Sequence, residues 1–261
     1  MLSLRAGAWS RRWVLGVGTG VIFLLFWQLA AGRWIDPHIL ASPAQILRAY
    51  GESLRAGAWL SSVFVSYGRI LSGWAIGGVL GAVLGTLMAR YLLTYHFFNP
   101  GLQFFRFIPS VAMVPVLVIW LGVGEGIKVV IVASGALIIV VISTVEGVRR
   151  VAEERIRAAR SLGASEQQVF WGILLPSATP AILKGFRGAL GYSFLHIVGV
   201  EMLAAKSGVG FMLWDARILQ RLDEMMMWVV TLGLMGLVAD QLLKLSLRLF
   251  AYRFEWGDLR A

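Results

Sequence analysis

Few residues of this sequence have the types and spacing that catalysis or metal binding requires. The chain has no cysteine, which excludes a disulfide framework, a cysteine-ligated zinc site and a thiol nucleophile. Its histidines, His38, His96 and His196, lie far apart, and none stands in a His-Glu-x-x-His spacing. The sequence has no G-x-x-x-x-G-K-[ST] phosphate-binding loop. We therefore expect no metal site, no bound cofactor and no ATP hydrolysis by this chain.

Two acidic residues stand out because they lie within or beside apolar runs, where ionisable side chains usually face a helix bundle or a cavity. Asp240 precedes Lys244 by one helical turn, and this i,i+4 spacing predicts an ion pair. Glu201 has only Lys206 as an obvious nearby cation. The sequence leaves two roles open for Glu201, a gate at the outer mouth of a pathway or a cap on a neighbouring helix.

Other polar or helix-breaking residues in apolar runs are candidates for lining a transport pathway. Prolines inside an apolar run remove backbone hydrogen bonds and bend the helix. The candidates are Pro109, Ser110, Pro115, Ser193, His196 and Glu201. Helix packing is the alternative for Pro109, Pro115, Ser193 and His196. For Arg106, near Pro109, the alternatives are attraction of an anion and anchoring at the membrane interface.

The composition indicates that these residues belong to a membrane protein. Of 261 residues, 58% are hydrophobic and 15% are charged, whereas soluble domains carry about a quarter charged residues. The mean hydropathy is +0.76. The net charge of +10 agrees with the excess of Lys and Arg that membrane proteins keep on the cytoplasmic side. Since no basic stretch is interleaved with aromatic residues, we expect no nucleic-acid partner.

Six apolar runs are long enough to predict transmembrane helices, over about residues 13–31, 70–88, 102–121, 129–145, 182–204 and 225–250. The first run resembles a signal peptide, but its length favours an uncleaved helix. In the second run Gly77, Gly81 and Gly85 recur on one helical face, which predicts close helix packing in lipid. Between the first two runs, Ala44 to Trp59 is predicted to form an amphipathic helix at the interface.

Six spans place both termini on one side of the membrane, and the positive charges indicate that this side is the cytoplasm. The N-terminal tail, the loop near Arg90, the long loop after residue 145 and the C-terminal tail hold nearly twice as many Lys and Arg residues as the opposite side. The predicted organisation has three parts. Residues 1–60 form a cytoplasmic tail, the first span and a periplasmic segment; residues 61–250 form a core of five spans with a cytoplasmic loop over 147–181; residues 251–261 form a cytoplasmic tail.

The long loop from Glu146 to Lys184 is too charged to cross a bilayer. We predict two short helices, Val151–Leu162 and Glu166–Leu174, joined by a turn at Gly163 to Ser165. Gly163 suits a left-handed helix end and Ser165 suits a helix N-cap. Pro176 and Pro180 are expected to stop the second helix. Such a loop is a short, rigid helical projection outside the membrane. The small side chains of Ala158 and Ala159 allow it to pack closely against a partner subunit.

The residues of this loop resemble the EAA loop of ABC importer permeases, written EAA-x3-G-x9-I-x-L-P. Ala158, Ala159, Gly163, Ile173, Leu175 and Pro176 fall in register, and Arg157 replaces the leading Glu. Phe107-Ile108-Pro109 and Ser161 to Ser165 further resemble the nitrate/taurine/alkanesulfonate permease family. The resemblance implies an all-α membrane protein with six transmembrane helices, the type I ABC importer permease fold and a cytoplasmic coupling helix.

The same resemblance implies the partners and the working residues. It implies a second copy of the permease, a cytoplasmic ATPase dimer carrying ATP and Mg, and an extracytoplasmic substrate-binding protein, in the lipid of a bacterial inner membrane. Small anions such as taurine, other sulfonates, nitrate or bicarbonate are the expected substrates. The ATPase-coupling residues are expected to be Arg157, Ala158, Ala159, Leu162, Gly163, Ala164, Ser165, Ile173, Leu175 and Pro176.

Two other functions remain as alternatives at this point. A stand-alone channel or secondary carrier would be favoured by inverted repeats, which the sequence does not display. A membrane enzyme would need clustered catalytic polar residues, which His38, His96 and His196 do not supply.

Overall fold

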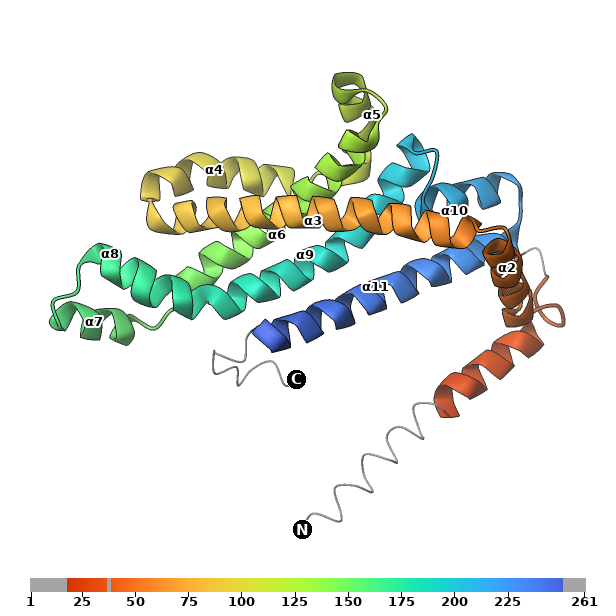
Figure 1. Cartoon of the computed structure of the whole chain (residues 1–261), viewed down its shortest axis with the longest axis horizontal. Helices are drawn as coiled ribbons and strands as arrows, with labels where there is room; N and C mark the ends of the chain where they lie inside the picture. Colours follow the sequence, from red (N-terminus) through yellow and green to blue (C-terminus); the bar gives the residue numbers. More distant parts are fainter. Residues whose placement is uncertain (1–17, 37–38, 251–261) are drawn as a thin grey trace, which may run out of the picture. The chain divides into compact units, whose positions relative to one another are not determined.

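The computed structural model describes residues 18–36 and 39–250, and the described chain is almost entirely helical (Figure 1). The helices are α2 (Pro43–Arg55), α3 (Ala58–Arg90), α4 (Leu92–Phe105), α5 (Ser110–Leu121), α6 (Glu125–Arg149), α7 (Glu153–Ser161), α8 (Glu166–Val169), the π-helical turn η1 (Phe170–Leu174), α9 (Leu175–Ala204), α10 (Val209–Ile218) and α11 (Leu222–Phe250). The start of the first predicted span and His38 lie outside the described residues.

Four described helical segments are long and apolar enough to cross a membrane: α3, α6, Glu166–Ala204 and Leu222–Leu249. The pair α4 and α5 raises this number to five if it forms one broken span, and Gly18–Ala30 is a shorter apolar helix. The all-helical membrane fold is therefore confirmed. The predicted number of six spans is not reached within the described part of the chain.

The third predicted span was wrong in its form. We expected one bent helix over residues 102–121, but α4 ends at Phe105, α5 begins at Ser110, and their axes differ by 105°. Pro109 explains the break, because proline has no N–H to continue the helix and its ψ of 127° is extended. Pro100 and Pro115 lie inside α4 and α5 without ending them.

The predicted helix stop at Pro176 and Pro180 was also wrong. Pro176 directly follows the π-helical turn η1, and Leu174 and Leu175 before it keep helical backbone angles, so the chain stays helical through this proline. Pro180 lies inside α9, which continues to Ala204. Residues Glu166–Ala204 therefore form one helical segment of 39 residues, and the loop helix joins the following span directly.

The described chain divides into two compact units, which are considered separately. One contains residues 18–60 and 212–230, and the other contains residues 61–211 and 231–250. In the first unit α2 begins within one residue of the predicted start at Ala44, but it ends at Arg55, and Trp59, the predicted end, belongs to α3. Ser42 and Gln45 form a capping box, Pro43 occupies the first turn, and Ile46 and Ala49 are buried.

The core of the second unit is formed by α3, α6 and α9. Gly77, Gly81 and Gly85 lie buried on one face of α3, against α6. A Cβ at Gly81 would lie 2.7 Å from the Leu137 carbonyl oxygen, and one at Gly85 would lie 2.7 Å from Thr144 Cβ. Glycine therefore lets the two backbones approach closely, which confirms the predicted packing role of this seam.

Helices α6 and α9 also pack extensively against each other. Ala136 and Val140 of α6 form a buried cluster with Ala189 of α9. Trp74 of α3 closes this cluster and donates its indole N–H to the Phe186 carbonyl oxygen at 2.8 Å. Many large apolar side chains face outward instead, as expected for helices whose surrounding solvent is lipid.

Candidate functional site

The turn between α7 and α8 has the helix ends that the sequence predicts. The N–H of Ala164 donates to the Ala159 carbonyl oxygen at 3.1 Å, and the N–H of Gly163 donates to the Arg160 carbonyl oxygen at 2.9 Å. These two bonds form a Schellman motif, and Gly163 supplies the required left-handed residue with φ of 84°. Ser165 then caps α8 in a capping box with Gln168.

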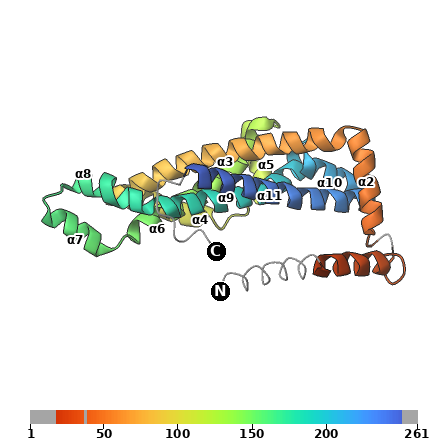
Figure 2. The same ribbon diagram turned by 60° about the horizontal axis from the view of Figure 1, so that its bottom comes forward.

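Helices α7 and α8 form a helical hairpin. Several contacts hold this hairpin together and attach it to the spans. Arg160 of α7 pairs with Glu166 of α8 at 2.9 Å. Phe170 of η1 is buried in a cluster with Val148 of α6 and Ala178 of α9. Arg90, at the end of α3, places its guanidinium 5.1 Å from the centre of the Phe170 ring. Both views show α7 and α8 beyond the same end of α6 and α9 (Figures 1 and 2).

The two alanines of the motif have different environments. Ala159 is buried inside the hairpin, whereas Ala158 is exposed. Leu162 lies one turn after Ala158 and is 88% exposed, so an apolar side chain stands at the tip of this polar loop. The exposed surface of α7 is mostly charged, and Ala158, together with Leu162 at the C-cap of the helix, forms its apolar part, with the buried Ala159 behind them.

The remaining motif residues lie where the hairpin meets the span. Ile173 and Leu175 are half-buried at the π-helical turn, and Pro176 is exposed. Arg157, which replaces the Glu of the EAA pattern, forms an ion pair with Glu153 one turn earlier in α7. In this chain Arg157 therefore has an intrahelical partner.

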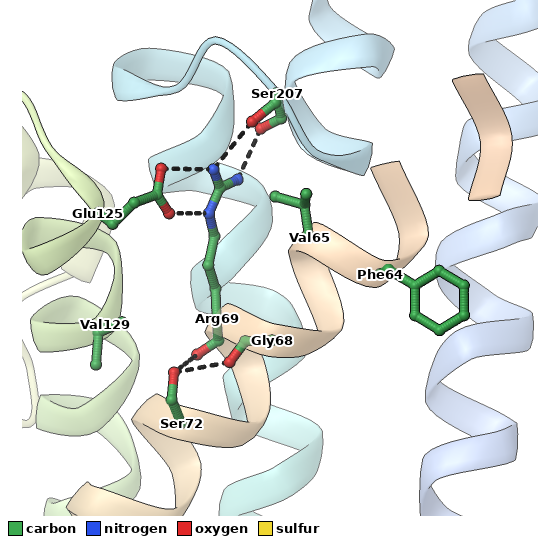
Figure 3. Close-up of a pocket in the computed structure, with 8 residues that line it drawn as sticks. All are labelled: Phe64, Val65, Gly68, Arg69, Ser72, Glu125, Val129 and Ser207. Atoms are coloured by element: carbon green, nitrogen blue, oxygen red, sulfur yellow. Dashed lines mark hydrogen bonds and ion pairs between the residues drawn. The ribbon is translucent and has the colours of Figure 1, made fainter. Parts of the chain in front are cut away.

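A buried ion network lies near the start of α6, whereas the hairpin follows the end of this helix. Figure 3 shows Arg69, Glu125 and Ser207 of this network. Arg69 of α3 binds Glu125 with Nε at 2.6 Å and Nη2 at 2.8 Å, and binds Glu201 of α9 with Nη1 at 2.7 Å. It also donates to the Ser207 carbonyl oxygen at 2.7 Å. Lys128 contacts Glu125 at 2.6 Å. The Arg69 side chain is 5% exposed, that of Glu201 is fully buried, and that of Glu125 is 65% exposed.

Glu201 uses this network to cap α10. Its carboxylate accepts the Gly210 N–H at 2.8 Å, and Ser66 Oγ accepts the Val209 N–H at 2.8 Å. These are N–H groups of the first turn of α10, which have no partner within the helix. Ser66 Oγ also lies 2.8 Å and 2.9 Å from the two Glu201 carboxylate oxygens. Gly208 has φ of 108°, and a Cβ there would collide with Glu201.

Of the two roles left open for Glu201, the structure places this residue as a helix cap. The main partner of Glu201 is Arg69, which lies 132 positions earlier and was not predicted from the sequence. One signal was available, since Arg69 is a cation bordering an apolar run that contains no acid to pair with it. The predicted pair between Asp240 and Lys244 is confirmed at 2.8 Å, and Arg187 of α9 adds a second contact to Asp240 at 2.6 Å.

A large cavity of about 810 Å³ lies between the α4–α5 break, α6 and α9. Among the pathway candidates, Ser110 and His196 line it, while Pro109, Pro115, Ser193 and Glu201 do not. Ser193 is buried and donates its hydroxyl to the Ala189 carbonyl oxygen at 2.8 Å. Arg106 also lines the cavity. Whether these residues meet a substrate stays a prediction.

Comparisons with known proteins agree with this arrangement. The family described as binding-protein-dependent transport system inner membrane component matches residues 77–255. A protein of Brucella melitensis named as an ABC transporter permease is 33% identical, over 85% of this chain and 92% of its own. The protein of Escherichia coli named as the aliphatic sulfonates transport permease SsuC is 31% identical, over 91% and 89%. The nitrate import permease NrtB of Synechocystis is 32% identical, over 84% and 82%.

A chain of the MetNI methionine ABC transporter, solved in inward-facing conformations, shares the fold. It has a TM-score of 0.57 and 18% identity, over 70% of this chain and 93% of that chain. Because the family covers more than half of the sequence and a relative at 33% identity covers 85% of it, this chain belongs to the binding-protein-dependent transport system inner membrane components, the permease subunits of ABC importers.

Proposed function

We propose that the hairpin of α7 and α8 is the contact through which a cytoplasmic ATPase dimer drives this permease. The observation that carries the proposal is the outward face of α7. Leu162, at 88% exposure, stands on a turn fixed by a Schellman motif, a capping box and the Arg160–Glu166 pair. A partner groove that covered Leu162 and Ala158 would remove this apolar surface from water.

The continuity of Glu166–Ala204 gives this contact a mechanical consequence. The α8 end of the hairpin and the span α9 belong to one helical segment, and Phe170 ties this segment to α6 through Val148. Displacement of the hairpin by a closing ATPase dimer would tilt these helices, because close-packed helices transmit strain. Alternation between inward and outward access would follow from this tilting.

The remaining parts of the proposal come from family membership and charge. A second copy of the chain would complete the pathway within the lipid of a bacterial inner membrane, with both termini in the cytoplasm. A binding protein outside the membrane would deliver the substrate, a small anion of the sulfonate, taurine, nitrate or bicarbonate type. Support for an anion comes from the sulfonate and nitrate permeases among the relatives and from the placement of Arg106 in the cavity.

The test is ATP-driven uptake by the reconstituted complex of permease, ATPase and binding protein. Leu162→Asp should abolish uptake, because the docking face would then present an unpaired charge, while Leu162→Met should retain it as the matched control. Ala158→Asp should act like Leu162→Asp. We choose Ala158 rather than Ala159 because Ala159 is buried in the hairpin, and a charge there would disturb the hairpin itself.

The complex is checked by co-purification before uptake is measured. Full uptake by Leu162→Asp in an intact complex would refute the docking role. Flux of the anion through the purified chain alone, without ATPase or ATP, would favour a stand-alone channel or carrier instead.

A further inference from the structure

The cavity beside the α4–α5 break lies half-way along the spans. Its lining from α6 runs over residues 130–142 of the helix Glu125–Arg149, and its lining from α9 includes residues 188–196 of Leu175–Ala204. A ligand there would thus be held near the middle of the membrane. The volume of about 810 Å³ falls within the range of roughly 300–1,000 Å³ that is typical of small-molecule sites.

Arg106 is the single charged residue among the described residues that line this cavity. It follows the last residue of α4, and its guanidinium carbon lies 4.7 Å from the centre of the Phe107 ring. No described residue forms an ion pair with Arg106. The side chain of Arg106 is exposed rather than buried in protein, so an anion in the cavity can reach its guanidinium.

The rest of the described cavity wall is neutral and largely aliphatic, with Met113, Leu117, Ile138 and Ile142 as examples. Hydroxyl and imidazole groups come from Ser110, Ser134, Tyr192 and His196. No aspartate or glutamate contributes to the described wall. An anionic group can therefore be neutralised by Arg106 and an apolar chain can contact the aliphatic wall, but an ammonium group would find no carboxylate among the described residues of this wall.

We propose that this cavity is a transit site selective for organic anions that carry an apolar chain and no ammonium group, with Arg106 as the contact for the anion. This inference rests on the proposed function and adds a second selection step, within the permease, to the choice made by the binding protein. It distinguishes among the expected substrates. Alkanesulfonates fit the cavity, whereas the ammonium group of the zwitterion taurine would be unpaired there and nitrate has no apolar chain to contact the aliphatic wall.

The test uses the permease–ATPase complex in lipid nanodiscs without binding protein, so that only the permease is probed. Propane-1-sulfonate and taurine form a matched pair, because a methyl group in one replaces the ammonium group of the other. We expect propane-1-sulfonate to bind at least about tenfold more tightly than taurine, since an unpaired charge in an apolar site is strongly disfavoured. Nitrate should bind more weakly than propane-1-sulfonate. Titration with labelled ligand measures all three.

Variants assign the effect to the cavity. Arg106→Gln should remove propane-1-sulfonate binding and Arg106→Lys should restore part of it, while Arg48→Gln, at an exposed arginine of α2, should change nothing. Ser134→Asp should weaken the binding of propane-1-sulfonate and strengthen the binding of taurine, while Ser134→Asn should leave the order of the two affinities unchanged. Each variant is compared with the wild type as an intact, ATP-hydrolysing complex.

Equal affinity for taurine and propane-1-sulfonate, binding of none of the three anions, or unchanged binding by Arg106→Gln would overturn the inference. These results are separable from failure of the proposed function. A wild-type complex that takes up no anion with ATP and binding protein would refute the proposed function, whereas normal uptake together with unaltered Arg106→Gln would refute the transit site alone.

Discussion

The buried ion network gives a prediction whose size follows from the contacts. Substituting Arg69→Met removes the guanidinium but keeps most of the apolar length of the side chain. Glu201 then stays fully buried with Ser66 Oγ and the Gly210 N–H as its partners, both of them neutral. Breaking a buried ion pair from one side costs about 3–5 kcal/mol, because the remaining charge is uncompensated.

The broken pair between Arg69 and Glu125 adds little to this cost. The Glu125 side chain is 65% exposed and retains Lys128 at 2.6 Å, so losing its contact with Arg69 should cost as much as losing an exposed ion pair, about 0–1 kcal/mol. We expect Arg69→Met to lower the free energy of unfolding of the chain by about 3–5 kcal/mol. In Glu201→Gln, Arg69 keeps Glu125 and Ser207, so the loss should be smaller, about 1–3 kcal/mol.

The double variant Arg69→Met/Glu201→Gln is the decisive comparison. It removes both buried charges, and the Gln carbonyl can still accept the Gly210 N–H. The double variant should therefore lose less free energy of unfolding than the two single variants lose together. The difference should be at least about 1 kcal/mol, which lies within the range of interaction energies between directly contacting residues. Unfolding of the purified chain in mixed micelles, titrated with denaturing detergent, measures all four proteins. Additive losses, or a loss below about 1 kcal/mol for Arg69→Met, would refute the reasoning.

Three further predictions concern local geometry. Gly77→Leu should prevent close packing of α3 on α6, because even a Cβ there would collide with the Ala133 carbonyl oxygen. Thermal melting of the detergent-solubilised chain, followed by circular dichroism, should then show a lower midpoint, and an unchanged midpoint would contradict the packing. Ser165→Ala should lose the N-cap of α8 at a cost of about 1 kcal/mol, visible as faster hydrogen exchange at Gln168, while Ser165→Asp should preserve slow exchange. Gly208→Ala should displace the turn before α10, since the φ of 108° suits glycine and the new Cβ would collide with Glu201. The turn should become more accessible to protease, and an unaltered digestion pattern would contradict this role of Gly208.

Features that depend on neighbours in the sequence were the most predictable. The hairpin ends follow from Gly163 and Ser165, and the glycine seam of α3 follows from a four-residue repeat. In each case the residue type satisfies backbone groups or permits an approach within one or two helical turns, so the chain alone carries the information.

Features that depend on distant residues were not predictable in this way. The pairing of Arg69 with Glu201 joins positions 132 apart, and no local pattern identifies that partner. Local rules also misjudged the prolines. Pro109 separates two helices by 105°, whereas Pro176 and Pro180 lie within a helix that continues. Whether a proline ends a helix or lies within one depends on the packing of the surrounding helices, which local rules do not include.

The central claim is that Leu162 contacts an ATPase subunit in the cytoplasm, and a single introduced cysteine tests it most directly. The natural chain contains no cysteine, so Leu162→Cys provides one reactive thiol without further substitution. In the complex with its ATPase, a short bifunctional thiol reagent should cross-link this position to a cysteine placed in the docking groove of the ATPase. In membranes, a reagent that cannot cross the bilayer should reach the thiol only from the cytoplasmic face. Labelling from the outer face of sealed right-side-out vesicles, or no cross-link to the ATPase in an active complex, would contradict the account.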